Sequence, residues 1–302
     1  MKLSIVTPSF GQLEWLRLAV ESVRDQVSDA APSISVEHLI MDAGTDGIET
    51  FADARGASFA RGGDEDTAVR AADEGYRLSV RSAPDRGMYD AINHGLRRAT
   101  GDVCAYLNCD EQYLPGVLAR VAAWFSDHPT ADVLFCDAIV VDAQGAYVCD
   151  RRVTLPTRIH TLVSGNLAVF TSSTFFRRRV LQDGGLLFDP SFRAAGDAEW
   201  IARLLETGAS LHTLRLRASI HTDTGKNLAL SPTARAEAER LAATAPWWAR
   251  RTRALAVLAH RLRRFRSGAY DLEPHRYAIY TRASPDARVE RSVSRPTFRW
   301  RR

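Results

Sequence analysis

The sequence has little cysteine and no long apolar run. Its 302 residues include four cysteines, none of them in a C-x-x-C pair, and a chain of this length can bury a core that needs no disulfide staples. We therefore expect reduced thiols rather than a disulfide framework or a zinc site. No stretch approaches the roughly 18 apolar residues that span a bilayer, and Pro8 interrupts the first apolar run too early for a signal peptide. These absences predict a cytoplasmic protein that is neither secreted nor membrane-spanning.

Two common nucleotide-binding motifs are also absent. No G-x-G-x-x-G follows the first apolar run, and no G-x-x-x-x-G-K-[ST] occurs anywhere, which disfavours Rossmann dehydrogenases and P-loop enzymes. A phosphate site without a glycine cradle usually neutralises its anion with a metal, and Mg²⁺ or Mn²⁺ often takes only one or two ligands from the protein. Asp110, beside Glu111 at the end of an apolar run, suits that role. A solvated turn acid is the alternative.

The net charge of +4 conceals two regions of opposite sign. From Pro246 onward the chain has 15 arginines and four acidic residues, a balance of +11, whereas residues 1–245 carry 25 basic and 32 acidic residues, a balance of −7. Such segregation indicates different partners for the body and the tail. No zinc module or aromatic–basic sheet motif accompanies the arginines, so we expect no nucleic-acid partner.

Short apolar runs and amphipathic segments alternate along the first half of the chain. The runs predict strands at residues 3–7, 36–41, 78–81, 103–107, 133–136 and 139–141. Helical spacing predicts helices at residues 13–27, from about 48, at 87–99 and at 117–125, with a polar surface insertion at 56–64. This alternation predicts an α/β fold with a mostly parallel sheet and flanking helices. Polar clusters follow several of the strands, where such sheets bind ligands.

The basic tail contains one amphipathic segment. Residues 247–268 place tryptophan, leucine and phenylalanine side chains on one helical face and arginines on another. That pattern is typical of an interfacial anchor on an anionic membrane surface; packing against the body or a partner subunit is the alternative. We expect residues 285–302 to be mobile.

Several motifs together resemble a known family. They are S-I-V-T-P-S-F from Ser4, D-A-G-T-D-G from Asp42, P-D-R-G-M-Y-D-A-I-N-H-G from Pro84, L-N-C-D-E from Leu107, S-T-F-F-R-R from Ser173 and F-R-A-A-G-D-A-E-W from Phe192. In this order they are similar to family 2 glycosyltransferases of bacterial surface-polysaccharide biosynthesis, over roughly residues 1–225. The resemblance implies a GT-A catalytic domain at 1–228, with a nucleotide-binding half at about 1–110 and an acceptor half at 111–228. A helical, arginine-rich extension would occupy 229–302.

The resemblance also implies an activity. Such enzymes move a sugar from a nucleotide-diphosphate donor, here expected to be a UDP-sugar, to a hydroxyl of a glycan or lipid-linked acceptor, with inversion at the anomeric carbon. The implied location is the cytoplasmic, inner face of the plasma membrane, as a peripheral protein. Two rivals stay open: a sugar nucleotidyltransferase, and a non-catalytic, membrane-associated scaffold of the same fold.

Matching motif positions imply the site residues. Asp197 would be the general base, and its position at the start of a predicted helix makes a capping role the alternative. Asp110 and His221 would contact Mn²⁺ or Mg²⁺, although the first acid of the usual D-x-D motif is Asn108 in this chain. The nucleotide would be held by Thr7, Pro8, Asp42, Asp90 and Asn93.

Overall fold

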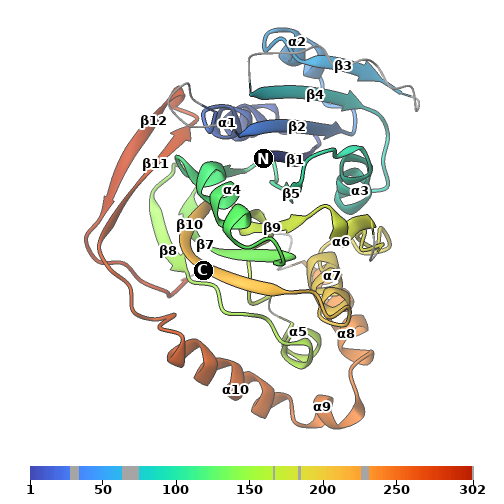
Figure 1. Cartoon of the computed structure of the whole chain (residues 1–302), viewed down its shortest axis with the longest axis vertical. Helices are drawn as coiled ribbons and strands as arrows, with labels where there is room; N and C mark the ends of the chain where they lie inside the picture. The colour runs from blue at the N-terminus through green and yellow to red at the C-terminus, as the bar shows by residue number, and fades with distance from the viewer. Residues whose placement is uncertain (28–33, 63–74, 166, 183–184, 226–230, 301–302) are drawn as a thin grey trace.

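The computed structural model describes residues 1–27, 34–62, 75–165, 167–182, 185–225 and 231–300. It consists of a large twisted sheet with helices on its faces and a C-terminal segment that runs around its outside (Figure 1). The helices are α1 (Leu13–Arg24), α2 (Ile48–Asp53), α3 (Met88–Arg98), α4 (Val117–Asp127), α5 (Arg158–Ser164), α6 (Arg179–Gln182), α7 (Gly196–Leu204), α8 (Pro232–Ala243), α9 (Trp247–Arg251) and α10 (Arg253–Arg266).

Ten strands form the main sheet, in the order β3-β4-β2-β1-β5-β9-β7-β10-β6, with β8 paired to β7. Their bounds are β1 (Lys2–Ser9), β2 (Ser35–Asp42), β3 (Ser58–Arg61), β4 (Tyr76–Ser82), β5 (Val103–Tyr106), β6 (Glu111–Tyr113), β7 (Val133–Asp142), β8 (Tyr147–Arg151), β9 (Thr174–Arg177) and β10 (Leu211–Asp223). The five strands from β3 to β5 are all parallel, as the alternating pattern predicts. Their carboxyl ends therefore meet at one edge.

The centre of the sheet is closely packed against α3. β1 is buried almost throughout, because it has a parallel partner on each side and helices above and below. A Cβ added at Gly95 of α3 would lie 2.4 Å from a methyl carbon of Val6. Only glycine therefore lets this helix approach the strand so closely.

Several element boundaries differ from the sequence-based expectations. One continuous strand, β7, replaces the two predicted at 133–136 and 139–141. The described part of the predicted surface insertion at 56–64 contains the edge strand β3, while residues 63 and 64 lie outside the described residues. The predicted single helix at 247–268 is divided into α9 and α10 at Thr252.

The C-terminal extension is only partly helical. α8, α9 and α10 confirm helices there, but β11 (His275–Thr281) and β12 (Ser284–Val293) form an antiparallel hairpin that the sequence analysis missed. The expectation that residues 285–302 are mobile is therefore wrong for β12. No helix within the described ranges is long and apolar enough to cross a bilayer.

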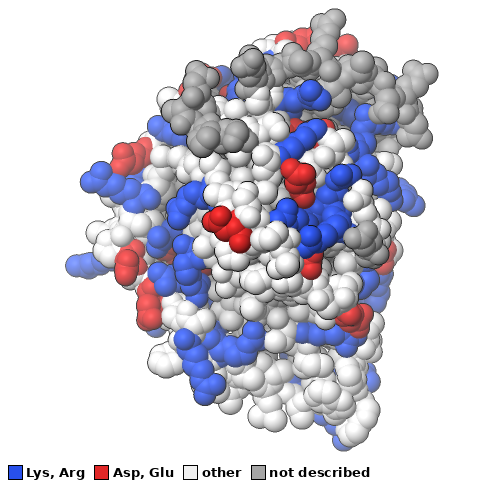
Figure 2. Space-filling view, viewed as in Figure 1, with Lys and Arg blue, Asp and Glu red and all other residues white. Residues whose placement is uncertain are grey.

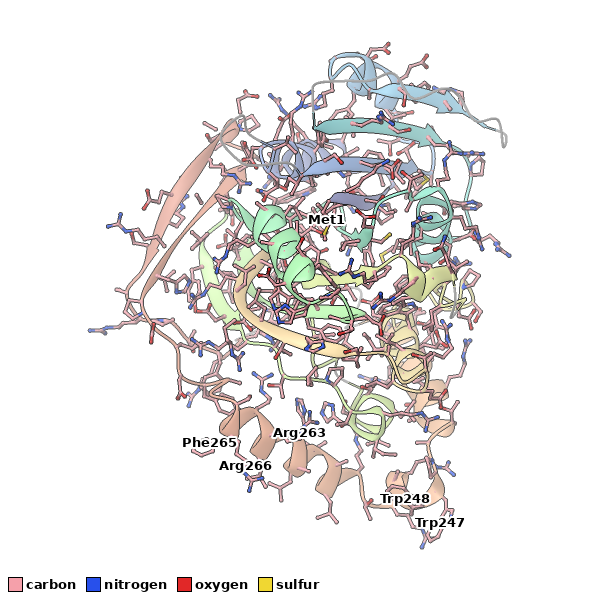
Figure 3. All side chains as sticks on the ribbon, in the orientation of Figure 1. Met1, Trp247, Trp248, Arg263, Phe265 and Arg266 are labelled. Atoms are coloured by element: carbon pink, nitrogen blue, oxygen red, sulfur yellow. The ribbon has the colours of Figure 1, made fainter. Side chains whose placement is uncertain are left out.

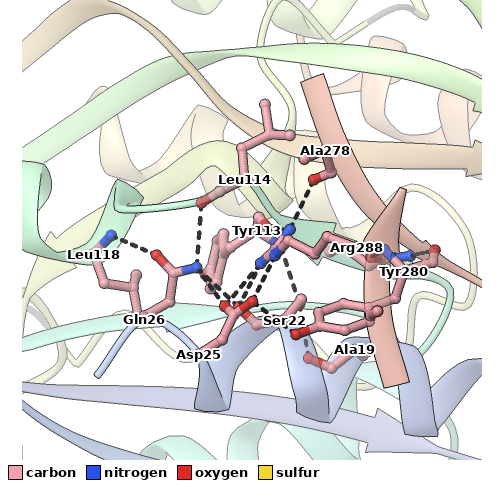
Figure 4. A network of polar contacts seen from close by, with 12 residues as sticks. Ala19, Ser22, Asp25, Gln26, Tyr113, Leu114, Leu118, Ala278, Tyr280 and Arg288 are labelled. Atoms are coloured by element: carbon pink, nitrogen blue, oxygen red, sulfur yellow. Dashed lines mark hydrogen bonds and ion pairs between the residues drawn. The ribbon is translucent and has the colours of Figure 1, made fainter. Parts of the chain in front are cut away.

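Arg288 attaches the hairpin to the body (Figure 4). Its Nε and Nη2 atoms donate to the two carboxylate oxygens of Asp25, at 2.5 and 2.8 Å, just after α1. Its Nη1 donates to the backbone oxygens of Tyr113 and Ala278 at 3.0 and 2.8 Å. The ring of Tyr280 lies beneath the guanidinium, 4.9 Å from it. One arginine thus joins β12, β11, β6 and α1.

Replacing this arginine should loosen the hairpin. In Arg288→Ala the Asp25 carboxylate and two backbone oxygens lose their donor, so we expect the free energy of unfolding to fall by about 2 kcal/mol. Denaturant titration measures this change. Arg291→Ala, at an exposed position of the same strand, is the matched control and should change stability by less than about 0.5 kcal/mol. Equal effects of the two substitutions would contradict the role given to Arg288.

Candidate functional site

Asp42 organises the loop that follows β2. Its Oδ2 accepts hydrogen bonds from the backbone N–H groups of Gly44 and Thr45, at 2.8 and 2.9 Å, and from the hydroxyl of Ser82 at 2.8 Å. Its Oδ1 is buried and has no hydrogen-bond partner among the described residues. A buried carboxylate oxygen without a partner is costly, and a ligand that donates a hydrogen bond there would remove the cost.

Asp42 also lines a small cavity. Its volume is about 110 Å³, and its walls come from the ends of β2 and β4, the loop that follows β4, and α3, including Asp42, Arg81, Asp85 and His94. It lies at the carboxyl edge of the parallel strands, where the sequence predicts a ligand site. Asp42 thus combines a place in the wall of this cavity with a buried oxygen that has no partner among the described residues.

Other residues predicted to hold the nucleotide have partners inside the protein. The Thr7 hydroxyl is fully buried and lies 2.9 Å from Nε2 of His38. The Asn93 amide exchanges two hydrogen bonds with the backbone of Phe188, at 2.8 and 2.9 Å. Asp90 forms hydrogen bonds with the backbone and side chain of Arg86 at 3.0–3.2 Å. Their contact with a nucleotide, like that of buried Pro8, stays a prediction, and the internal contacts of Thr7 and Asn93 do not favour it.

Asp197 lies in the first turn of α7 but does not cap it. Its Oδ1 accepts a hydrogen bond of 2.6 Å from the hydroxyl of Tyr106, the last residue of β5, and its Oδ2 accepts one of 3.3 Å from Thr171. Its backbone N–H donates to the hydroxyl of Tyr89 at 3.2 Å. The capping alternative is therefore wrong: no side chain caps α7 at its N-cap residue, Ala195.

This setting tunes the acidity of Asp197. Burial raises the pKa of the Asp197 carboxyl, and the nearby charge of Glu111 adds to the increase; the hydrogen bonds from Tyr106, Tyr89 and Thr171 oppose it without cancelling it. A carboxylate with a raised pKa accepts a proton more readily than an ordinary one. The geometry is thus suited to general-base chemistry.

Asp110, Glu111 and His221 form a second cluster. The pairing of β6 with β10 places Glu111 opposite His221, and the histidine Nδ1 lies 3.0 Å from a Glu111 oxygen. Burial and the charge of Glu111 raise the pKa of the Asp110 carboxyl to about 6. Burial lowers the pKa of His221, but the hydrogen bond and charge of Glu111 outweigh this effect and the net direction is upward.

The residues at this cluster fit a cation that is only partly held by protein. Within the described part of the chain, no group of three or more His, Cys, Asp or Glu side chains could hold a metal alone. However, the Oδ1 of Asn108 is buried without a hydrogen-bond partner among the described residues, close in sequence to Asp110. Two oxygen ligands with phosphate and water completing the shell would suit Mg²⁺ or Mn²⁺.

Some residues at the site were not predicted. Tyr106 is part of an apolar run, and nothing in its sequence context indicates a contact with a residue 91 positions later. Glu111 has a fixed place between Asn108 and His221. Trp300, in the tail, donates to Asp223 at 2.9 Å and lies edge-on to the His221 ring, 5.6 Å away. Strand pairing and contacts between distant segments determine the positions of all three residues, and a local sequence motif shows neither kind of contact.

The chain is similar to several proteins from mycobacteria. A PGL/p-HBAD biosynthesis glycosyltransferase of Mycobacterium bovis is 37% identical over 82 residues, which is 26% of this chain and 32% of that protein. An uncharacterized glycosyltransferase of Mycobacterium tuberculosis is 28% identical over 206 residues, covering 66% of this chain and 67% of that protein. The first match thus spans about a third of its relative's length.

Solved structures share the fold. Staphylococcus aureus TarS in complex with UDP superposes with a TM-score of 0.54 at 16% identity, over 80% of this chain and 64% of that one. The mannosyltransferase PcManGT from Pyrobaculum calidifontis, in complex with GDP-Man and Mn²⁺, gives a TM-score of 0.50 at 15% identity, over 85% of this chain and 74% of that one. The sequence profile described as Glycosyl transferase family 2 matches residues 4–185. That match covers more than half of the sequence, so this chain belongs to glycosyl transferase family 2.

Proposed function

We propose that the protein is an inverting glycosyltransferase that moves a sugar from a nucleoside-diphosphate donor to a hydroxyl of a surface-glycan or lipid-linked acceptor. The observation that supports this most directly is the hydrogen bond between Tyr106 and Asp197. It joins the proposed base to the strand that leads into Asp110, while the Asp42 cavity lies at the carboxyl edge of the same parallel strands. The relatives in complex with UDP and GDP-Man agree with a nucleotide-sugar donor, and we favour a UDP-sugar.

The proposed reaction needs a proton acceptor and a way to stabilise the leaving group. Asp197 would take the proton from the acceptor hydroxyl as its oxygen attacks the anomeric carbon. Because the attack and the departure occur on opposite faces of the sugar, the base and the leaving-group site must come from different segments, as Asp197 and Asp110 do. A divalent cation held by Asn108 and Asp110 would supply positive charge to the departing diphosphate. His221, hydrogen-bonded to Glu111, would contact the cation or the diphosphate on the same side.

The two rivals are less well supported. Nucleotidyl transfer uses carboxylates that hold metal ions on the phosphates, and it gives no role to a carboxylate held away from them by two hydroxyl groups, as Asp197 is. A non-catalytic scaffold would have no need of a buried, unpartnered oxygen at Asp42 or of a raised pKa at Asp197.

Removing the base should slow turnover strongly but leave donor binding unchanged. In Asp197→Asn we expect the rate to fall by about 10²–10⁴-fold, with the dissociation constant for UDP unchanged. The assay follows diphosphate release from a panel of UDP- and GDP-sugars, with water or added acceptors.

The wild-type rate should rise as pH increases through the raised pKa of Asp197, because only the carboxylate accepts a proton. Glu199→Gln, on the same helix and paired to Arg203, is the control; wild-type turnover in Asp197→Asn would contradict the assignment.

Metal dependence gives an independent test of the second cluster. In Asp110→Ala we expect calorimetric binding of UDP in the presence of Mn²⁺ to weaken about tenfold or more, to the level that wild type shows in EDTA. Asp127→Ala, at an exposed position, should bind as wild type does. Binding that responds neither to EDTA nor to Asp110→Ala would show that this acid holds no cation.

We further propose that α9 and α10 dock on an anionic membrane surface. Eight large apolar side chains are prominently exposed in the described part of the chain, and six of them lie on these two helices, including Trp247 (67% exposed), Leu255 (63%) and Phe265 (72%). Trp247 and Phe265 lie on the outer edge of the molecule in Figure 3. The surface around these helices is white and blue in Figure 2, since no acidic residue occurs between Pro246 and Tyr270.

The inner side of these helices already has partners. Ala249 and His260 are buried, and Arg263 donates to the backbone of Leu155. The packing alternative is therefore right for one face and leaves the other for a partner. Exposed apolar side chains flanked by arginines match a lipid interface, where each cation near an anionic surface contributes on the order of 1 kcal/mol.

Vesicle binding tests this proposal. Wild type should cosediment with vesicles of phosphatidylcholine and phosphatidylglycerol, more weakly at high salt, and hardly at all with phosphatidylcholine alone. Leu258→Ser combined with Phe265→Ser should reduce binding about tenfold or more, because each apolar side chain contributes about 1.5 kcal/mol or more. Phe10→Ser, which changes an equally exposed side chain elsewhere, should not. Unchanged binding by the double variant, or a wild-type dimer that this variant dissociates, would contradict lipid docking.

A further inference from the structure

A carboxylate from the C-terminal extension holds the loop that leads into α7. Glu237, in α8, accepts three backbone hydrogen bonds from consecutive residues: from Arg193 at 2.6 Å on one oxygen, and from Ala194 and Ala195 at 2.9 and 2.8 Å on the other. The glutamate is buried, with 7% of its surface exposed. Both of its oxygens are thus committed to this loop.

This arrangement fixes the backbone just before α7. The first N–H groups of a helix need acceptors, and a side chain at the N-cap usually supplies one. The N-cap of α7 is Ala195, whose side chain has no acceptor. Glu237 binds the N–H groups of Ala195 and of the two residues before it, and not those of the first helical turn. Hydrogen bonds to an ionised carboxylate are stronger than neutral ones, and its negative charge is favourable near the positive end of α7.

The clamped loop carries the proposed base. Asp197 follows Ala195 by two residues, and its carboxylate is aimed by Tyr106 and Thr171. These two hydroxyl groups can hold the carboxylate only if the backbone at the start of α7 is in the right place. On the other side of the loop, the Arg193 guanidinium fills the space where a Cβ at Gly87 would lie, 2.3 Å from that position.

α8 itself is fixed to the same region. The Arg240 side chain donates to the Ser191 hydroxyl at 2.7 Å and lies 3.8 Å from the centre of the Phe192 ring. The next residue, Leu241, packs in an apolar cluster with Leu162 of α5 and Ala202 of α7. Glu237 is therefore held on a rigid element that contacts both ends of the segment it clamps.

We propose that Glu237 is a positioning residue for the reaction: it sets the backbone at the start of α7 and thereby the place of the Asp197 carboxylate. It touches no reacting atom in this scheme and acts only through Asp197. The inference rests on the proposed function, since it assigns a purpose to the clamp only if Asp197 is the base. It also makes the C-terminal extension a part of the catalytic apparatus.

The main variant is Glu237→Gln in the full chain. Its side-chain nitrogen would face backbone N–H groups and leave at least one of them without an acceptor. The assay follows diphosphate release from the nucleotide sugar that wild type turns over in the panel. We expect kcat to decrease by about tenfold to a hundredfold, with KM for the donor unchanged. Glu237→Asp keeps the charge but is too short to reach all three N–H groups, so its kcat should lie between those of wild type and Glu237→Gln. Glu239→Gln, exposed on the same helix, is the control and should match wild type.

Two further measurements separate positioning from general destabilisation. Hydrogen exchange should accelerate at the amides of Arg193, Ala194 and Ala195 in Glu237→Gln and not in Glu239→Gln. In the Asp197→Asn background, adding Glu237→Gln should cause no further loss of rate, because the base through which it acts is already gone. A separate, full loss in that background would overturn the inference.

The outcomes distinguish this inference from the proposed function. If Asp197→Asn turns over normally, the base assignment fails, and with it the purpose given to Glu237, even where exchange shows that the clamp exists. If Asp197→Asn is inactive while Glu237→Gln has faster exchange and an unchanged kcat, the base stands and the positioning role of Glu237 is wrong.

Discussion

The buried carboxylate of Glu37 joins the segments on which the site is built. It accepts hydrogen bonds from Ser4 of β1 at 2.6 Å and from the backbone and side chain of Thr100 before β5 at 2.9–3.1 Å, and it pairs with Lys2. Burial would raise the pKa of Glu37, but these contacts outweigh it and hold the pKa below its usual range. The charge therefore persists inside the protein and keeps β1, β2 and β5 in register at the edge opposite the site.

When the amino-terminal ends of parallel strands are held in register, the positions of their carboxyl-terminal ends are determined as well. Because β1, β2, β4 and β5 run side by side in the same direction, the residues that follow them meet without any further device. Asp42 comes at the end of β2, Tyr106 at the end of β5 and Asp110 four residues later. The later part of the chain joins these strands through the pairing of β9 with β5, through Asn93 and Phe188, and through the hydrogen bond from Tyr106 to Asp197. The raised pKa of Asp197 is a consequence of burying a carboxylate where these two halves meet.

The sequence predicts the parts of the fold that depend on local pattern. Strands β1, β2, β4 and β5 are apolar runs with both faces covered, and α3 begins after Gly87, so their approximate bounds follow from periodicity and composition. The hairpin of β11 and β12 was missed because its outer strand is mostly polar and exposed, and it is attached by distant contacts such as those of Arg288 and of Tyr280 with Gln112. Similarly, Glu237 resembles any acid on an amphipathic helix; its role arises from three backbone groups more than 40 residues away. Contacts of that kind have no local signature.

The excess positive charge of the tail serves more than one purpose. Arg288 forms internal hydrogen bonds that attach the hairpin to α1 and β6. Arg263 attaches α10 to the body. In contrast, Arg261 and Arg266 are exposed beside apolar side chains. Deleting the tail from Pro246 would therefore remove structural and surface arginines together, along with the Trp300 contact to Asp223 near His221. A protein lacking this segment would lose stability and site geometry as well as any lipid contact. Point substitutions of the exposed apolar side chains on the outer face of α10, such as Phe265, change the proposed lipid contact while leaving the structural arginines and Trp300 in place.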